Sequence, residues 1–463
     1  MNKPAVPQSA PLDTPPAGRA APHLQRVLGL GDLVFYGIVL IQPVGVIGLF
    51  GVASKMSHGH MATSVLIAMA AMMVTAVSYG RMAAMFPSAG SAYTYVGRGL
   101  NTHLGFLAGW AMVLDYLIIP VVNVIYGALS ANRLLPGIPY SAWVLIIGLG
   151  MTVLNARGIR WTARANQFLL ATMCAVIVAF VIAATRYLFR TQGSAGLLSM
   201  APFYDPATFD FRSVCTATSF AAAAYIGFDG ITTLAEDAIE PKRTVPLATV
   251  LVCLVTGLTA VVQVYLAQRV APDSQSFSNV ETAFMDIAAQ VGGPWLFKAI
   301  AVVMAVACLG SGLTGQVGAA RLLYSMGRDN VLPRAVFGRL DARHAPTFNL
   351  WLIGAIALAG AFVLDYEWAT ELINFGAFLA FMGVNAAAIR VYWFQTPPGH
   401  QRQWLADLGV PGLGLLFCFW IWWSLPTPAQ VVGGIWFVAG IVYLAIKTRG
   451  FRRRPVMLDF SET

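Results

Sequence analysis

Two aspartates, Asp115 and Asp229, lie inside long apolar segments of the sequence. A carboxylate at the centre of a membrane helix costs roughly 2.5–3.5 kcal/mol, so it is expected to have a cation, a proton or a hydrogen-bonding neighbour. Two such groups facing one cavity would hold the two ends of a diamine, or one would bind substrate and the other a coupling proton. The sequence leaves these roles open, and it leaves open a structural role for Asp115.

Two apolar segments are interrupted by residues that break helices. In the first, Pro43 removes a backbone donor, and Gly45 allows a ligand to approach the backbone. In the second, Gly227, Asp229 and Gly230 interrupt the apolar pattern. Interrupted helices at corresponding positions of two halves are typical of a transporter binding site, although one proline alone can simply kink a packed helix. The predicted substrate-binding residues are Gln42, Pro43, Val44, Gly45, Asp115, Tyr225, Gly227, Phe228 and Asp229.

Further polar residues are candidates for ion coupling and gating. The coupling-ion candidates are Asp115, Asp229, Ser311 and Thr314, the last two for a sodium-like site. The gate candidates are Glu236, Asp237 and Arg321 at an inner gate, and Trp368 and Asn374 at an outer gate. The three inner-gate charges are equally consistent with an ordinary solvated surface, because a surface ion pair contributes only about 0–1 kcal/mol to stability.

The composition predicts an all-α integral membrane protein. Of the 463 residues, 58% are hydrophobic and 11% are charged, whereas soluble domains have about 25% charged residues. A span needs about 20 apolar residues. The twelve predicted spans cover approximately residues 28–54, 61–86, 103–130, 138–156, 163–187, 213–236, 246–269, 295–325, 349–365, 369–393, 404–425 and 428–447, and residues 278–293 suit an external loop helix.

The distribution of Lys and Arg predicts the orientation. With both termini in the cytoplasm, 22 of the 29 basic residues fall on the cytoplasmic side and 7 on the external side, as expected for short loops. The predicted organisation is a disordered cytoplasmic tail at 1–22, helices 1–5 at 23–190, helices 6–10 at 191–393, helices 11–12 at 394–447 and a cytoplasmic tail at 448–463. The expected location is a bacterial inner membrane.

An enzyme, a metalloprotein or a nucleic-acid-binding protein is not expected. The five cysteines are scattered through apolar segments without a Cys-x-x-Cys pair, and neither a HExxH motif nor a P-loop occurs. A channel would need a filter or rings of charge, and a solute sensor would need a soluble output domain. The expected partners are a small-molecule substrate and the lipid bilayer, with no cofactor beyond a coupling proton or sodium ion.

Several motifs resemble those of the amino acid–polyamine–organocation (APC) permeases, over about residues 25–450. These motifs lie at 87–95 (PSAGSAYTY), 225–229 (YIGFD) followed by 235–237 (AED), and 321–329 (RLLYSMGRD). Segments 110–123 (WAMVLDYLIIPVVN) and 372–377 (LINFGA), and the end at 461–463 (SET), are most like the bacterial putrescine importers of that family. The resemblance implies a LeuT-like fold, with an inverted repeat of helices 1–5 and 6–10 and discontinuous helices 1 and 6. It also implies proton-coupled uptake by alternating access.

The first break departs from the pattern of amino acid permeases. Those members usually have a Gly-Ser-Gly type motif whose backbone holds the substrate carboxylate, and this chain has Gln42-Pro43-Val44-Gly45-Val46 instead. The substitution favours a polyamine such as putrescine. An amino acid permease remains the alternative, because exposed N–H groups near Gly45 would still accept a carboxylate.

Overall fold

The structure is a computed structural model that describes residues 27–87, 90–158, 163–235, 237–328, 332–341 and 345–452. Within these ranges it consists of helices, turns and one isolated bridge, between Leu28 and Ala238. Nine helices of the described residues are long and apolar enough to cross a membrane, or ten if the bent pair α1 (Leu30–Ile41) and α2 (Gly45–Met56) forms one span. The predicted all-helical, multi-pass membrane architecture is confirmed at this level.

Every predicted span contains a helix. The long helices are α3 (Met61–Met85), α5 (Thr102–Leu134), α6 (Tyr140–Ala156), α7 (Ala163–Gln192), α9 (Pro241–Val270), α10 (Ala283–Arg328), α12 (Thr347–Val363), α13 (Tyr366–Ala388), α14 (Val410–Trp423) and α15 (Thr427–Lys447). Because α6 and α12 have only 17 residues each, the count of twelve spans stays a prediction.

Shorter helical elements connect or extend the long helices. They are α4 (Ser91–Gly99), α8 (Phe211–Ala221), α11 (Arg334–Phe337), η1 (Ser194–Gly196), η2 (Ala222–Tyr225), η3 (Phe228–Leu234), η4 (Val280–Thr282), η5 (Ile389–Gln395) and η6 (Trp404–Gly409). The predicted loop helix corresponds to η4 and the first turns of α10, which Gly293 separates from the rest of α10 with a φ of 72°. The sequence analysis did not predict α4 or α11, since neither is long enough to give a clear apolar period.

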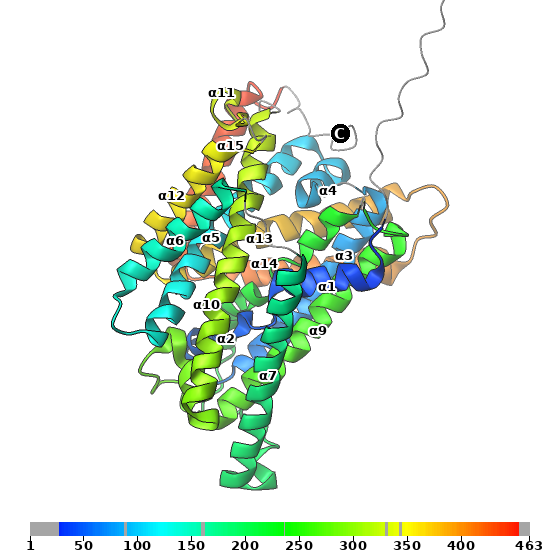
Figure 1. The fold of residues 1–463 in the computed structure, drawn as a ribbon. Helices are drawn as coiled ribbons and strands as arrows, with labels where there is room; N and C mark the ends of the chain where they lie inside the picture. Colours follow the sequence, from blue (N-terminus) through cyan, green and yellow to red (C-terminus); the bar gives the residue numbers. More distant parts are fainter. Residues whose placement is uncertain are drawn as a thin grey trace, which may run out of the picture.

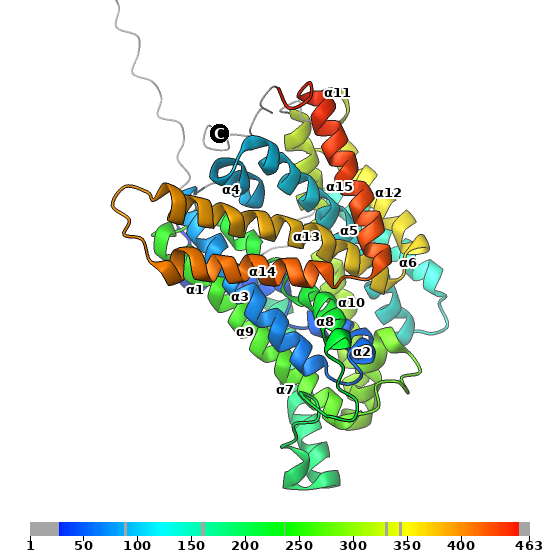
Figure 2. The same cartoon turned by 180° about the vertical axis from the view of Figure 1, so that it is seen from behind.

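Helix α5 forms the centre of the bundle. It packs against α10 on one side and α13 on another, while α3 pairs with α9. In Figure 1 the lower end of α7 projects past the neighbouring helices. Figure 2 shows α13 and α14 running side by side across the back of the molecule. This packing surrounds the two interrupted segments with α3, α5, α9, α10 and α13.

Candidate functional site

The first predicted break is present and bends the chain by 48° between α1 and α2. Gln42 has a φ of 62°, a backbone conformation that is uncommon outside glycine. Its side-chain Nε2 donates to the carbonyl of Ala307 in α10 at 2.9 Å, and Gln263 of α9 donates through Nε2 to the carbonyl of Pro43 at 3.2 Å. A side chain of α9 therefore satisfies the Pro43 carbonyl of the break, and the Gln42 side chain ties the break to α10.

Open space lies beside the first break. Gly45 is only half-buried, and a Cβ built on it would meet no atom within 4 Å. The preceding residue, Val44, is fully buried. Because α2 begins at Gly45, the partial positive charge of its N-terminus faces the break, while the carbonyl end of α1 faces it from the other side.

The second predicted break is also present, at Ile226 and Gly227. The chain changes from α8 to the 3₁₀ turn η2, becomes extended at Ile226, and resumes as the 3₁₀ helix η3. Gly227 has a φ of 119°, which strongly favours glycine. A Cβ on Gly227 would lie 3.4 Å from Cγ of Leu40. The two breaks are therefore packed against each other.

Asp115 and Asp229, which we term the central carboxylates, lie close together. They are 5% and 6% exposed, and near enough for their charges to interact. Helix α13 approaches α5 closely here, because a Cβ on Gly376 would lie 3.3 Å from the amide nitrogen of Asp115. The structure thus brings together the two aspartates that the sequence analysis selected, from segments more than one hundred residues apart.

The central carboxylates differ from most buried charges in their partners within the described part of the chain. No Lys, Arg or His within the described residues forms an ion pair with either aspartate. Oδ1 of Asp115 is buried and lacks a hydrogen-bond partner in this part of the chain. The Asp229 carboxylate interacts with the backbone amides of Gly227 and Gly230 in the break. Since buried charges are normally paired, the arrangement is suited to bind a cation or a proton.

Aromatic side chains from five helical elements gather near the central carboxylates. The charge of Asp229 acts on Tyr36 of α1, Tyr79 of α3 and Tyr116 of α5. The ring of Tyr79 meets Phe228 and Phe381 edge-on, with centroids 5.3 and 5.5 Å away, and its buried hydroxyl has no described partner. Aromatic faces beside a carboxylate suit an organic ammonium group.

These aromatic residues were mostly missed by the sequence analysis. Tyr116 directly follows Asp115, and Tyr36 lies six residues before Gln42. Their closeness in sequence to predicted site residues could have marked both tyrosines as candidates. Tyr79 and Phe381 lie inside apolar helices far from either break, and the sequence gives no sign of their direction.

Tyr225 lies elsewhere than predicted. It is fully buried, and its hydroxyl donates to the carbonyl of Val65 in α3 at 3.1 Å. The structure therefore gives it a packing contact between α3 and the second break. Phe228, by contrast, lies within the aromatic group next to Asp229.

The sodium candidates are only loosely arranged. Thr314 is exposed and its hydroxyl donates to the carbonyl of Gly310 in its own helix at 3.0 Å, while Ser311 is half-buried. Gln42 already occupies the nearby carbonyl of Ala307. Among the described residues no group of three or more His, Cys, Asp or Glu side chains is placed to hold a metal ion.

The inner-gate candidates do not form the suggested ion pair where the structure describes them. Glu236 lies outside the described residues. Asp237 makes no ion pair with Arg321, and its backbone carbonyl instead accepts from the amides of Val27 and Leu28, both at 3.0 Å. These bonds tie the start of α1 to the end of the second break. Arg321 is exposed, and its charge acts on Tyr36.

The outer-gate candidates differ from each other. Trp368 is 45% exposed at the start of α13. Asn374 is fully buried and donates through Nδ2 to the carbonyl of Ser219 in α8 at 2.7 Å. Asn374 thus joins α13 to the helix that leads into the second break.

Asp407 is a buried carboxylate of a different kind. It forms an ion pair with Arg81 and accepts hydrogen bonds from the amide of Gln403 at 2.7 Å and from His400 Nε2, which lies 2.9 Å away. The Arg81 guanidinium also lies over the ring of Tyr392, 3.9 Å from its centroid. Asp407 therefore has charged partners within the chain and holds α3, η5 and η6 together.

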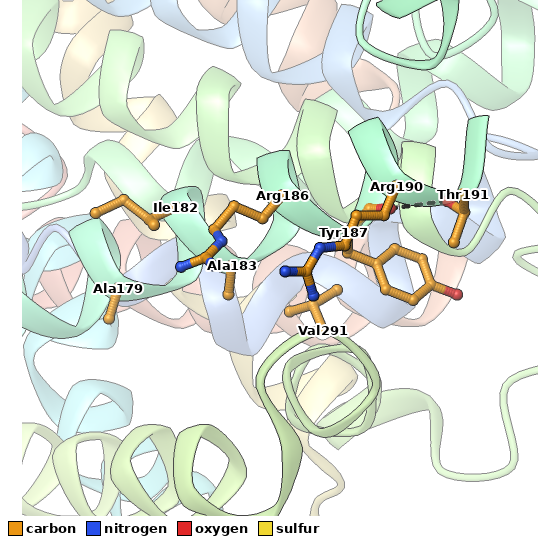
Figure 3. A pocket seen from close by; sticks show the side chains of 8 residues that line it. All are labelled: Ala179, Ile182, Ala183, Arg186, Tyr187, Arg190, Thr191 and Val291. Carbon is orange, nitrogen blue, oxygen red and sulfur yellow. Dashed lines mark hydrogen bonds between the residues drawn. The ribbon is translucent and has the colours of Figure 1, made fainter. Parts of the chain in front are cut away.

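A separate groove of about 480 Å³ lies between the projecting end of α7 and the start of α10. Figure 3 shows the side chains of Arg186 and Arg190 at this groove, above Val291. It contains none of the predicted site residues, and its basic lining is opposite in charge to the central carboxylates.

Comparison with known proteins identifies the family. The family model described as amino acid permease matches residues 32–454. The chain is 32% identical to the low-affinity putrescine importer PlaP of Escherichia coli strain K12 over 438 residues, which cover 93% of this chain and 95% of PlaP. It is 27% identical to the branched-chain amino acid permease BcaP of Lactococcus lactis over 455 residues, covering 92% and 96% of the two chains. This chain therefore belongs to the amino acid permease family of the APC superfamily, and it is a membrane transporter.

Proposed function

We propose that the protein imports a small organic diamine such as putrescine, and that Asp115 and Asp229 bind its ammonium groups. The observation that carries this proposal is the central pair of buried carboxylates, which interact with each other and have no described cationic partner. A substrate with two positive charges would neutralise both groups. The aromatic rings of Tyr79 and Phe228 beside Asp229 add a surface for the ammonium and its methylene chain.

The two breaks provide the geometry for transport. The carbonyl end of α1 lies beside Gly227 in the second break, two residues from Asp229, and both a helix carbonyl end and a carboxylate attract a cation. Because α1 and η3 are packed together, one side of the site is expected to move as a unit against α3, α5 and α13 during alternating access.

The proposed coupling ion is a proton. Two carboxylates of like charge in surroundings of low polarity cannot easily both stay ionised when no diamine bridges them. In the arrangement in which Asp229 holds one ammonium group, a proton taken up by Asp115 on the external side would enter the cytoplasm together with the substrate, which couples uptake to an inward proton gradient. A sodium ion at Ser311 and Thr314 is the less favoured alternative, because Thr314 is exposed and bonded within its own helix.

The proposed location is a bacterial inner membrane with both termini in the cytoplasm. The excess of Lys and Arg on the predicted cytoplasmic side supports this orientation.

Transport of an α-amino acid is the second candidate. It is favoured by the open space at Gly45, where the N-terminus of α2 would accept a substrate carboxylate. The relative BcaP is named as a branched-chain amino acid permease. Against this candidate, the carboxylate of an amino acid would approach Asp115 and Asp229, two groups of the same charge.

The test is uptake of radiolabelled putrescine into proteoliposomes, with and without an inward proton gradient. We expect accumulation that depends on the gradient and is not competed by a hundredfold excess of neutral α-amino acids. Competition by a branched-chain amino acid, or no putrescine uptake together with amino acid uptake, would contradict the proposal and favour the second candidate.

A further inference from the structure

Four acidic residues gather at the end of α13 that the predicted topology places outside the cell. We call Glu281, Asp365, Glu367 and Glu371 the acidic rim. Their charges interact with one another, and Glu281, from η4, interacts with the backbone amide of Tyr366 at the start of α13. Within the described residues, Lys55 acts on this group through Glu367. The four carboxylates of the rim outnumber that cation.

Glu371 is the buried member of the rim. It is 1% exposed, and its Oε1 has no hydrogen-bond partner among the described residues. Asn374 lies three residues later, on the same face of the helix, and is fully buried with a similarly unpartnered Oδ1. Its amide orientation is fixed, because Nδ2 donates to the carbonyl of Ser219. Two buried acceptor oxygens thus lie on one face of α13, and no described residue donates a hydrogen bond to either.

The position of Glu371 is between the rim and the central carboxylates. Gly376, which packs against the backbone at Asp115, follows Glu371 by five residues, about 7.5 Å along a helix. On the other side, Tyr366 packs against Tyr126 of α5 with ring centroids 4.9 Å apart. Carboxylates therefore occur at successive levels from the end of α13 to the middle of the bundle.

We propose that Glu371 and Asn374, together with the acidic rim, form an outer binding site for a primary ammonium group, which the substrate occupies before it reaches Asp115 and Asp229. An ammonium carries three donors and one positive charge. It would satisfy both unpartnered oxygens and neutralise Glu371. The identity of this ligand rests on the proposed function, whereas the site itself rests on the burial, charge and unpartnered oxygens of α13.

The experiment measures initial rates of putrescine uptake in proteoliposomes for the wild-type protein and the variant Glu371→Gln. The change removes the charge and keeps the shape. We expect KM to rise about tenfold with Vmax within about twofold, because an interaction with entering substrate is lost while the central site stays intact. Asp286→Asn is the matched control, since Asp286 is an acidic residue on the same predicted side but is already paired with Arg133. Its KM should not change.

Separate outcomes distinguish the two proposals. An unchanged KM in Glu371→Gln, with normal uptake by the wild-type protein, would overturn the outer site and leave the proposed function standing. Absence of amine uptake by the wild-type protein would overturn both. If Glu371→Gln does not reach the membrane or is not monodisperse when purified, the variant Glu367→Gln is measured instead, because Glu367 is partly exposed. A KM increase of about threefold is then expected, and a KM equal to that of Asp286→Asn would overturn the site.

Discussion

Asp407 and Asp229 are both buried aspartates, yet their surroundings are opposite. Asp407 has an ion pair with Arg81 and further hydrogen bonds from His400 and Gln403. Asp229 has backbone amides and aromatic rings around it and no described cationic side chain. The difference indicates that the chain supplies a counter-charge where a carboxylate holds helices together. It leaves the counter-charge to a substrate or proton where the helices are broken.

The largest expected effect is that of Asp229→Asn. Losing one member of a buried charge pair costs about 2–5 kcal/mol, and every 1.4 kcal/mol is about a factor of ten, so uptake of putrescine should fall at least about 30-fold. The amide keeps the size of the side chain, and the protein should still reach the membrane, which quantitative blotting of membrane fractions checks. Normal uptake by this variant would remove Asp229 from the site.

Asp407→Asn should have the opposite pattern. Breaking its charged hydrogen bonds should lower the free energy of unfolding by about 1.5–3 kcal/mol, seen as a lower melting temperature of the purified protein. Uptake per folded molecule should stay within about twofold of wild type. A specific loss of uptake at unchanged stability would break the comparison between the two aspartates.

Asp115→Asn sharpens the comparison within the central pair. If Asp115 carries the coupling proton, uptake by this variant should no longer respond to an inward proton gradient that raises wild-type uptake about tenfold. The measurement is the initial uptake rate across a series of external pH values at fixed internal pH. A profile with the same shape as that of the wild-type protein would exclude Asp115 as the carrier of the coupling proton.

The smallest expected effects are those of removing the hydroxyl group from each of two buried tyrosines. Tyr79→Phe should raise KM by about two- to fivefold, because the unpartnered hydroxyl lies in the aromatic group beside Asp229. Tyr225→Phe should leave KM unchanged and lower stability by about 1 kcal/mol, because that hydroxyl donates to the Val65 carbonyl. Uptake kinetics and thermal unfolding of both variants provide the test. A KM effect confined to Tyr225→Phe would reverse the assignment.

Local sequence was enough to predict the two breaks. Pro43 and Gly227 act on their own backbone, and their effect does not depend on distant contacts. Asp115 and Asp229 stood out because a charge in an apolar segment needs a partner wherever the helix lies. These features are visible residue by residue.

The residues that line the site could not be predicted from the sequence, because they come together only through helix packing. Tyr79 and Phe381 reach Asp229 only through the positions of α3 and α13. Tyr225 was assigned to the site from its closeness in sequence, but the chain turns 3₁₀ there, and the tighter turn alters the direction of each side chain. The burial of Glu371 could not be predicted from its place in the sequence, because it follows from the packing of α13.

The central claim is that the unpaired carboxylates bind the substrate cation. The most direct test is equilibrium binding of radiolabelled putrescine to the purified protein by scintillation proximity, for the wild-type protein, Asp229→Asn and Asp407→Asn. We predict that Asp229→Asn weakens binding at least about 30-fold and that Asp407→Asn binds as the wild-type protein does. Equal binding by the wild-type protein and Asp229→Asn would contradict the account.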